Sequence, residues 1–282
     1  MLKKLGFIVT GVCVILYIFI CLILRFGQTK LIFQPDDLIK STPEKYNLYY
    51  EDVWIAIDQE KIHGWWIPYR QKTAPVLLYF HGNGSNNGDL PGIAAMFNQL
   101  KLSVLLIDYR GYGKSSPRFP NETRVYEDAD AAWEYLTKKR QIKPQNIFIY
   151  GHSLGGAIAI NLAIKHPQMA GLITEGTFTS MKEIAGFNRA FRLFPLDWII
   201  TQRFDSITKI KSLQTPLLIF HGSADQTIPA YMAQKLFNAA PEPKQLVIIP
   251  QATHNNVHQA GGQEYFQTLQ RFIQANSEAA HP

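Results

Sequence analysis

The stretch that decides the fold is NIFIYGHSLGG, residues 146–156. An apolar run leads into Gly151-His-Ser-Leu-Gly155, and a helical pattern follows, so the sequence predicts a strand, a sharp turn and a helix. A turn this sharp needs glycine two positions before and after Ser153, because a β-carbon there would collide with the chain. The hydroxyl would then be exposed beside the free amides of a helix N-terminus. We therefore predict that Ser153 is a nucleophile.

Outward from this turn, apolar runs alternate with helical patterns. This alternation predicts an α/β fold with a mainly parallel sheet and helices on both faces. The stretch 177–212 interrupts it and is interpreted as a small helical cap. Its mixture of aromatic and basic residues suits a membrane surface or an acyl pocket, or equally a helical hairpin packed on the core. The expected strands are 48–57, 61–67, 76–80, 103–108, 146–150, 171–174, 216–220 and 245–249, and the expected helices are 90–100, 124–139, 154–166, 229–239 and 262–275.

The N-terminal segment differs from the rest of the chain. Residues 5–24 contain no charged side chain, and twenty helical residues at about 1.5 Å each match a bilayer core of roughly 30 Å. A cleaved signal peptide remains an alternative, although its apolar run would be shorter and a small-residue cleavage site is missing after residue 24. We predict one N-terminal transmembrane helix within an anchor, residues 1–30, ahead of a globular domain, residues 31–282.

The charges on the two sides of the apolar run differ little, so they give only a small preference for one orientation in the membrane. Lys3 and Lys4 precede the run, and Arg25 and Lys30 follow it. The positive-inside rule therefore leans toward a cytoplasmic N-terminus, with the globular domain on the non-cytoplasmic side of a single-pass membrane protein.

The amino-acid composition limits the kinds of partner and cofactor that we expect for this protein. The net charge is +6, but the basic residues are scattered along the sequence, so we expect no nucleic-acid partner. We interpret the positive charge as suited to a domain that is held close to anionic membrane lipid. Cys13 and Cys21 both lie in the apolar run, which leaves the globular part without disulfides or thiolate metal ligands. The histidines lack the spacing of a zinc site, so no metal is expected. The sequence does not indicate the oligomeric state.

A second glycine-rich segment follows the expected strand 76–80. The sequence HGNGS, residues 81–85, leaves backbone amides free to donate, and a tetrahedral oxyanion needs two such donors. We predict that the backbone N–H groups of Asn83 and Leu154 form an oxyanion hole. The alternative is an ordinary flexible turn.

A base and its carboxylate partner should follow the serine. Asp225 comes just after the expected strand 216–220, and His254 comes after 245–249. The order Ser153, Asp225, His254 is the order of nucleophile, acid and histidine in this type of fold. His254 would take the serine proton and Asp225 would fix its tautomer. His258 and His221 are the rival histidines.

Taken together, these motifs resemble the α/β-hydrolase superfamily, in particular its membrane-anchored bud-emergence-type and serine aminopeptidase-like branch. The resemblance covers nearly all of residues 31–275. It implies an eight-stranded sheet, no metal or organic cofactor, and hydrolysis of an ester, thioester or amide. The motifs that carry it are HGNGSN at 81–86, DYRGYGKSS at 108–116, GHSLGG at 151–156, HGSADQTIP at 221–229 and ATHNN at 252–256.

Two classes of function are therefore expected. The first is a serine hydrolase that cleaves a small-molecule or acyl substrate near a membrane through an acyl-enzyme. The second is a non-catalytic binding or scaffolding module with the same fold. Such modules usually lose a triad member, whereas Ser153, Asp225 and His254 are all present here, which favours the enzyme. None of the three comes from the anchor.

Overall fold

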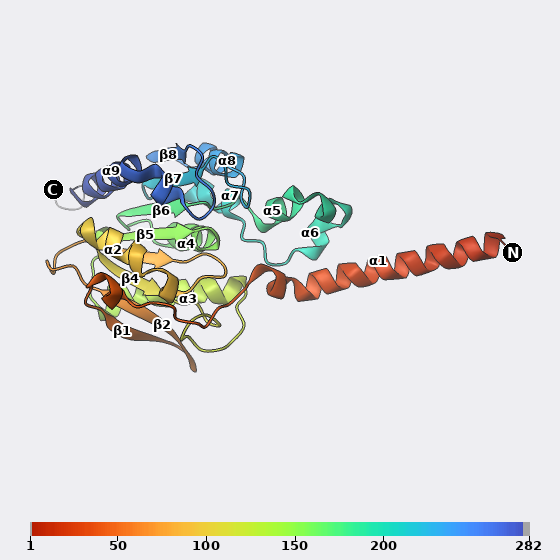
Figure 1. Ribbon diagram of the computed structural model, residues 1–282, viewed down its shortest axis with the longest axis horizontal. Helices are drawn as coiled ribbons and strands as arrows, with labels where there is room; N and C mark the ends of the chain where they lie inside the picture. Colours follow the sequence, from red (N-terminus) through yellow and green to blue (C-terminus); the bar gives the residue numbers. More distant parts are fainter. Residues whose placement is uncertain (1, 279–282) are drawn as a thin grey trace.

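The computed structural model describes residues 2–278, and its centre is one eight-stranded sheet in the order β1-β2-β4-β3-β5-β6-β7-β8 (Figure 1). The pairs β1–β2 and β2–β4 are antiparallel, and the other pairs are parallel. The predicted α/β fold with a mainly parallel sheet is therefore confirmed. The strands are β1 Glu51–Ile57, β2 Glu60–Ile67, β3 Val76–Phe80, β4 Ser103–Ile107, β5 Ile147–His152, β6 Gly171–Glu175, β7 Leu217–Gly222 and β8 Lys244–Ile249.

Helices cover both faces of the sheet, which is why the central strands are continuously apolar. Every residue of β3, β4, β6 and β7 is buried. One core layer includes side chains of α3, α4 and α8, and the other includes side chains of α2 and α9. These helices are α2 Pro91–Gln99, α3 Glu122–Glu134, α4 Leu154–Lys165, α8 Tyr231–Ala239 and α9 Val257–Glu278.

Two predicted helices differ from the structure by more than two residues at their ends. The α-helical part of 124–139 ends at Glu134, and a π-helical turn, Tyr135–Lys139, continues it. The last helix begins at Val257 rather than 262, and the chain kinks at Gly262, where φ is 46°. Glycine tolerates that left-handed angle without steric cost, so one element contains two helical segments.

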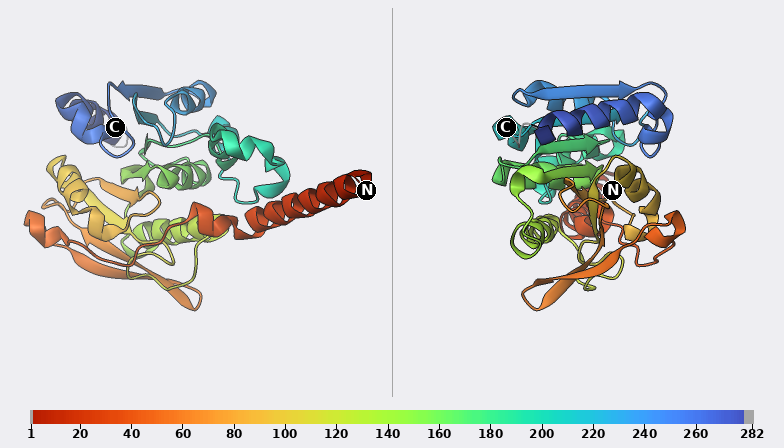
Figure 2. Two further views of the ribbon diagram at one scale, coloured as in Figure 1. Left: turned by 45° about the vertical axis from the view of Figure 1, so that its right-hand side comes forward. Right: turned by 90° about the vertical axis from the view of Figure 1, so that its left-hand side faces the viewer.

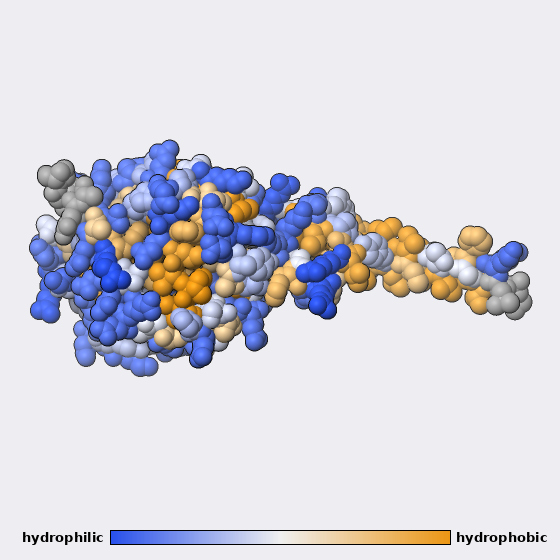
Figure 3. Space-filling view, turned by 90° about the horizontal axis from the view of Figure 1, so that it is seen from above, coloured by the Kyte–Doolittle hydropathy of each residue, from blue (hydrophilic) through white to orange (hydrophobic). Residues whose placement is uncertain are grey.

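Helix α1, Leu2–Ile32, projects from the globular part (Figures 1 and 3). It is long and apolar enough to cross a membrane. Apolar surface runs along most of the projecting rod in Figure 3, and residues of the expected span such as Ile15 and Phe19 are exposed. Water solvates so much apolar surface poorly, whereas lipid solvates it well. The helix also extends eight residues past the predicted span.

The segment 177–212 lies beside α1 at one end of the sheet (Figures 1 and 2). The carboxylate of Glu122, at the start of α3, accepts hydrogen bonds from the amides of Arg203 and Phe204. We call residues 177–212 the cap. The contact with Glu122 holds the C-terminal part of the cap against the globular core. The cap contains α5 Met181–Phe187, α6 Leu196–Ile199, α7 Ser206–Lys209 and the 3₁₀ turns Arg189–Leu193 and Ile210–Ser212.

Candidate active site

Ser153 lies on a strained turn between β5 and α4. Its φ of 54° and ψ of −117° are unusual for a residue with a β-carbon, and such angles persist only where neighbouring contacts hold them. The Ser153 amide donates to the Glu175 carbonyl at 2.8 Å, and the Thr177 hydroxyl donates to the Ser153 carbonyl at 2.9 Å. The end of β6 therefore holds the turn from both sides of the serine.

The two glycines of the turn are required by close backbone approaches. A β-carbon on Gly151 would collide with the Gly155 carbonyl, and one on Gly155 would collide with the Phe80 carbonyl at the end of β3. The turn therefore packs directly against its own helix and against the neighbouring strand. This is the physical reason for the glycine spacing around Ser153.

Three side chains that are far apart in the sequence form one hydrogen-bonded chain. The Ser153 Oγ lies 2.9 Å from the His254 Nε2, and the His254 Nδ1 lies 2.7 Å from the Asp225 Oδ2. Asp225 follows β7, and His254 follows β8. Because the carboxyl ends of parallel strands meet at one edge of a sheet, β5, β7 and β8 bring the three residues to the same place.

The surroundings of Asp225 keep its carboxylate charged. Burial alone would raise its pKa, but hydrogen bonds from His221, His254 and the Ile228 amide hold the pKa well below the ordinary aspartate value. An ionised carboxylate can only accept hydrogen bonds, so the His254 Nδ1 carries the proton. The Nε2 is then an acceptor facing the Ser153 hydroxyl, which is the tautomer that a general base needs.

The rival histidines have other surroundings. The buried His221 has its Nε2 2.7 Å from the Ile228 carbonyl, so it braces the loop that carries Asp225. His258 lies in the first turn of α9, with its ring centroid 6.4 Å from that of Tyr265. His254 lies in the turn before α9, so His254 and His258 do not share a helical face.

Asn83 and Leu154 line the same pocket as Ser153. Leu154 is the first residue of α4, where a backbone N–H has no carbonyl partner within the helix. The Asn83 side chain is fixed: its Oδ1 accepts from the Gln34 amide at 2.7 Å and from the Tyr112 hydroxyl at 2.9 Å. Both residues therefore border the cavity beside the Ser153 hydroxyl.

The loop after β4, DYRGYGKSS, holds the glycine-rich loop that carries Asn83. In addition to Tyr112, Tyr109 donates its hydroxyl to the His81 carbonyl at 2.9 Å. The Asp108 carboxylate accepts from the Asn87 amide at 2.7 Å. Sequence reasoning did not assign these residues to the site. The sequence signal that could have found them was the DYRGYGKSS motif, because its polar and aromatic residues directly follow a buried strand.

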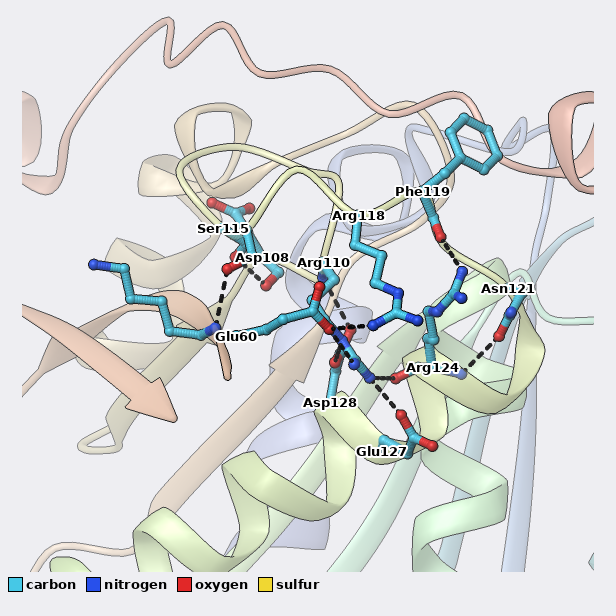
Figure 4. Close-up of polar contacts among 12 residues, drawn as sticks. Glu60, Asp108, Arg110, Ser115, Arg118, Phe119, Asn121, Arg124, Glu127 and Asp128 are labelled. Carbon is cyan, nitrogen blue, oxygen red and sulfur yellow. Dashed lines mark hydrogen bonds and ion pairs between the residues drawn. The ribbon is translucent and has the colours of Figure 1, made fainter. Parts of the chain in front are cut away.

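The same loop is anchored on its other side by Arg110 (Figure 4). The buried guanidinium contacts the carboxylates of Glu60 at 2.9 Å, Glu127 at 2.6 Å and Asp128 at 2.6 Å. Charge-assisted hydrogen bonds of this kind are strong when several satisfy one buried cation. The arginine therefore ties the loop to β2 and α3, and through the loop it steadies the region around Asn83.

An apolar pocket of about 330 Å³ opens beside Ser153. The cap supplies part of its wall, including Met181, Ile184 and Phe191. Helix α1 supplies another part, through its residues Leu24, Gln28, Leu31 and Ile32. Sequence reasoning assigned no part of the site to α1. A helical spacing of four, seven and eight residues after Leu24 was the available signal, since it places these positions on one face.

Among residues 2–278, no cluster of three or more histidine, cysteine or acidic side chains could hold a metal ion. The arrangement of a serine, a histidine and an ionised aspartate can carry out acyl transfer without one. Together with the sheet order and the turn between β5 and α4, it defines the α/β-hydrolase fold.

Comparison with known proteins agrees with this class. The family model for serine aminopeptidase S33 matches residues 71–208. Protein bem46 of Schizosaccharomyces pombe is 33% identical over 249 residues, which cover 83% of this chain and 80% of that protein. WAV2 of Arabidopsis thaliana, an alpha/beta hydrolase domain-containing protein, is 30% identical over 270 residues and 88% and 87% of the two chains. The chain therefore belongs to the bem46-type branch of the α/β hydrolases.

Solved structures show the same fold at lower identity. An esterase of Pyrococcus furiosus, Pf2001, superposes with a TM-score of 0.73 at 18% identity, covering 86% of this chain and 98% of the esterase. The predicted resemblance and fold are thus confirmed.

Proposed function

We propose that this protein is a serine hydrolase that cleaves an ester, thioester or amide bond of an acyl substrate. The observation that carries the proposal is the hydrogen-bonded chain from Ser153 through His254 to the ionised Asp225, opening on an apolar pocket. Among the similar proteins, the serine aminopeptidase family and the esterase are by name hydrolases of amide and ester bonds. A scaffolding module would not need this geometry.

The reaction follows from the positions of these groups. His254 takes the Ser153 proton as Oγ attacks the substrate carbonyl carbon, and the resulting oxyanion accepts hydrogen bonds from the Asn83 and Leu154 amides. His254 then gives the proton to the leaving alcohol, thiol or amine, and an acyl-serine ester remains. A water molecule, deprotonated by His254, attacks this ester, and the carboxylic acid leaves as Ser153 regains its proton.

We also propose that α1 is a single-pass anchor and that the substrate is amphiphilic. An apolar pocket suits an acyl chain, and an uncharged span of twenty residues suits a bilayer. The flanking charges favour a globular domain on the non-cytoplasmic side. Membrane lipid is then the partner of the protein, and nucleic acid is not.

The first test uses a fluorophosphonate probe, which reacts only with an activated serine hydroxyl. We expect the wild-type protein to be labelled at Ser153 and Ser153→Ala to lose both labelling and turnover of nitrophenyl esters. Ser212→Ala removes an exposed hydroxyl in the cap and is the matched control, with labelling unchanged. A wild-type protein that is neither labelled nor active on any ester, thioester or amide would instead be a binding module.

A further inference from the structure

The last turns of α1 lie against the cap and line the pocket beside Ser153. Leu24, Gln28 and Ile32 lie on the same face of the helix and all contact the pocket. Eight residues separate Leu24 from Ile32, so this wall follows the helix for about 12 Å. Leu24 is also the last residue of the uncharged run 5–24. The wall therefore begins near the active-site serine and ends where the expected membrane span begins.

Gln28 fastens this wall to the cap. The side chain is only 6% exposed. Its Nε2 donates to the Ile199 carbonyl at 3.0 Å, and its Oε1 accepts from the amides of Thr201 and Gln202 at 2.9 Å each. The bond to the Ile199 carbonyl is buried, and that carbonyl would be costly to leave without a partner. One side chain thus satisfies three groups of the cap, which fixes the position of α1 relative to the pocket.

The edge of the cap also reaches along α1 into the expected span. The Tyr17 hydroxyl donates to the Leu193 carbonyl at 2.9 Å, and the Tyr17 ring stacks on Phe194 with centroids 5.6 Å apart. Tyr17 lies seven residues inside Leu24, or about 10 Å along the helix. Leu193 is 76% exposed, although it is a large apolar residue. A bilayer around residues 5–24 would therefore cover this edge.

Arg25 and Trp198 contact each other just beyond the end of the expected span. The guanidinium carbon lies 4.7 Å from the centroid of the Trp198 ring, and the guanidinium also contacts the Trp198 carbonyl. The tryptophan remains 47% exposed. Tryptophan and arginine are the residues that gather at membrane–water interfaces. Their position next to Leu24 agrees with a span that ends there.

From these contacts we propose that the substrate is a long-chain acyl compound resident in the bilayer, and that its chain enters the pocket sideways, between α1 and the cap. Helix α1 is then part of the acyl-binding subsite as well as an anchor. The proposal rests on the serine hydrolase function proposed above. It specifies the substrate class and the route by which the substrate reaches Ser153.

A lateral route has a clear energetic reason. Moving an acyl chain from lipid into water costs about 0.8 kcal/mol for each methylene group. A pocket whose wall continues into the bilayer removes this cost, because the chain stays in contact with apolar side chains along the whole path. The apolar lining, which includes Leu24 and the buried Phe178, supplies such contacts.

The test uses the full-length protein in lipid nanodiscs, with nitrophenyl palmitate dissolved in the bilayer and nitrophenyl acetate in the water. Leu24→Trp fills the outer part of the pocket. We expect it to lower the palmitate-to-acetate ratio of kcat/KM at least tenfold. Ile23→Trp places the same ring on a neighbouring exposed position outside the pocket and is the matched control. An unchanged ratio in Leu24→Trp, or equal losses in both variants, overturns the lateral route.

A binding measurement separates this proposal from the function on which it rests. Ser153→Ala in nanodiscs is irradiated with a phospholipid that carries a photoreactive group on its acyl chain. We expect cross-links at residues 24–32 and 181–200, and we expect Leu24→Trp to reduce them. Cross-links confined to exposed positions such as Ile15 and Phe19 overturn the route. If cross-links form in the pocket but the wild-type protein hydrolyses no acyl substrate, the hydrolase function fails and the chain-binding site remains.

Discussion

The groups proposed for the chemistry and the walls of the pocket belong to two differently built regions. Ser153, Asp225 and His254 follow strands of the central sheet, and β7 is buried along its whole length. The pocket that leads to them lies between α1 and the cap, where no residue of α5 is fully buried. A rigid sheet can hold reacting atoms within tenths of an ångström, whereas a peripheral wall can change without disturbing them. The proposed bond cleavage and the proposed binding of an acyl chain would therefore be governed by separate parts of the molecule.

The largest effect should come from the sheet-borne groups. We expect His254→Ala and Asp225→Asn each to lower kcat by about 10³–10⁴-fold on esters of any chain length, because both remove the base or its correct tautomer. His258→Ala, the matched control, should stay within a few-fold of wild type. Steady-state kinetics with a short and a long ester measure this. A loss that depends on chain length, or a larger loss in His258→Ala, would contradict the division of roles.

An intermediate effect is expected where α1 joins the cap. Gln28→Leu keeps the size of the side chain but removes the partner of the buried Ile199 carbonyl, at about 1–3 kcal/mol, and of the less buried amides of Thr201 and Gln202. The cap should then separate from α1, and the palmitate-to-acetate ratio of kcat/KM should fall about tenfold. Thr10→Val, at an exposed position of the same helix, is the control. A uniform loss on both esters would show that the two regions are coupled.

The smallest effect should come from the loop after β4. Tyr112→Phe removes one hydrogen bond from the Asn83 side chain, while the bond from the Gln34 amide remains. One such bond contributes about 1 kcal/mol, so kcat should fall about fivefold with KM little changed. The exposed Tyr49→Phe serves as control. An effect on KM for the long ester alone would place Tyr112 with the pocket wall instead.

The sequence predicts the sheet and the Ser153–His254–Asp225 grouping because both depend on local patterns. Each of these residues follows an apolar strand, and parallel strands bring their carboxyl ends together. The part played by α1 was not predictable in this way. Gln28 contacts Ile199 across 171 residues of sequence, and Leu24 and Leu31 fit a membrane span as well as a pocket wall. Their helical spacing places these residues on one face, but it does not show that this face packs against the cap rather than against lipid.

The junction between α1 and the globular part is rigid, and this affects where the active site lies relative to a membrane. The Phe33 amide continues the hydrogen-bonding pattern of the helix to the Thr29 carbonyl, and its side chain is 1% exposed in the core. The helix thus enters the globular part without a flexible linker. In an anchored protein, this rigid junction would hold Ser153 at one height above the bilayer, because about 12 Å of helix separates the end of the span at Leu24 from the end of the helix at Ile32. Substrates would then be sorted by how far their scissile bond lies from the bilayer core.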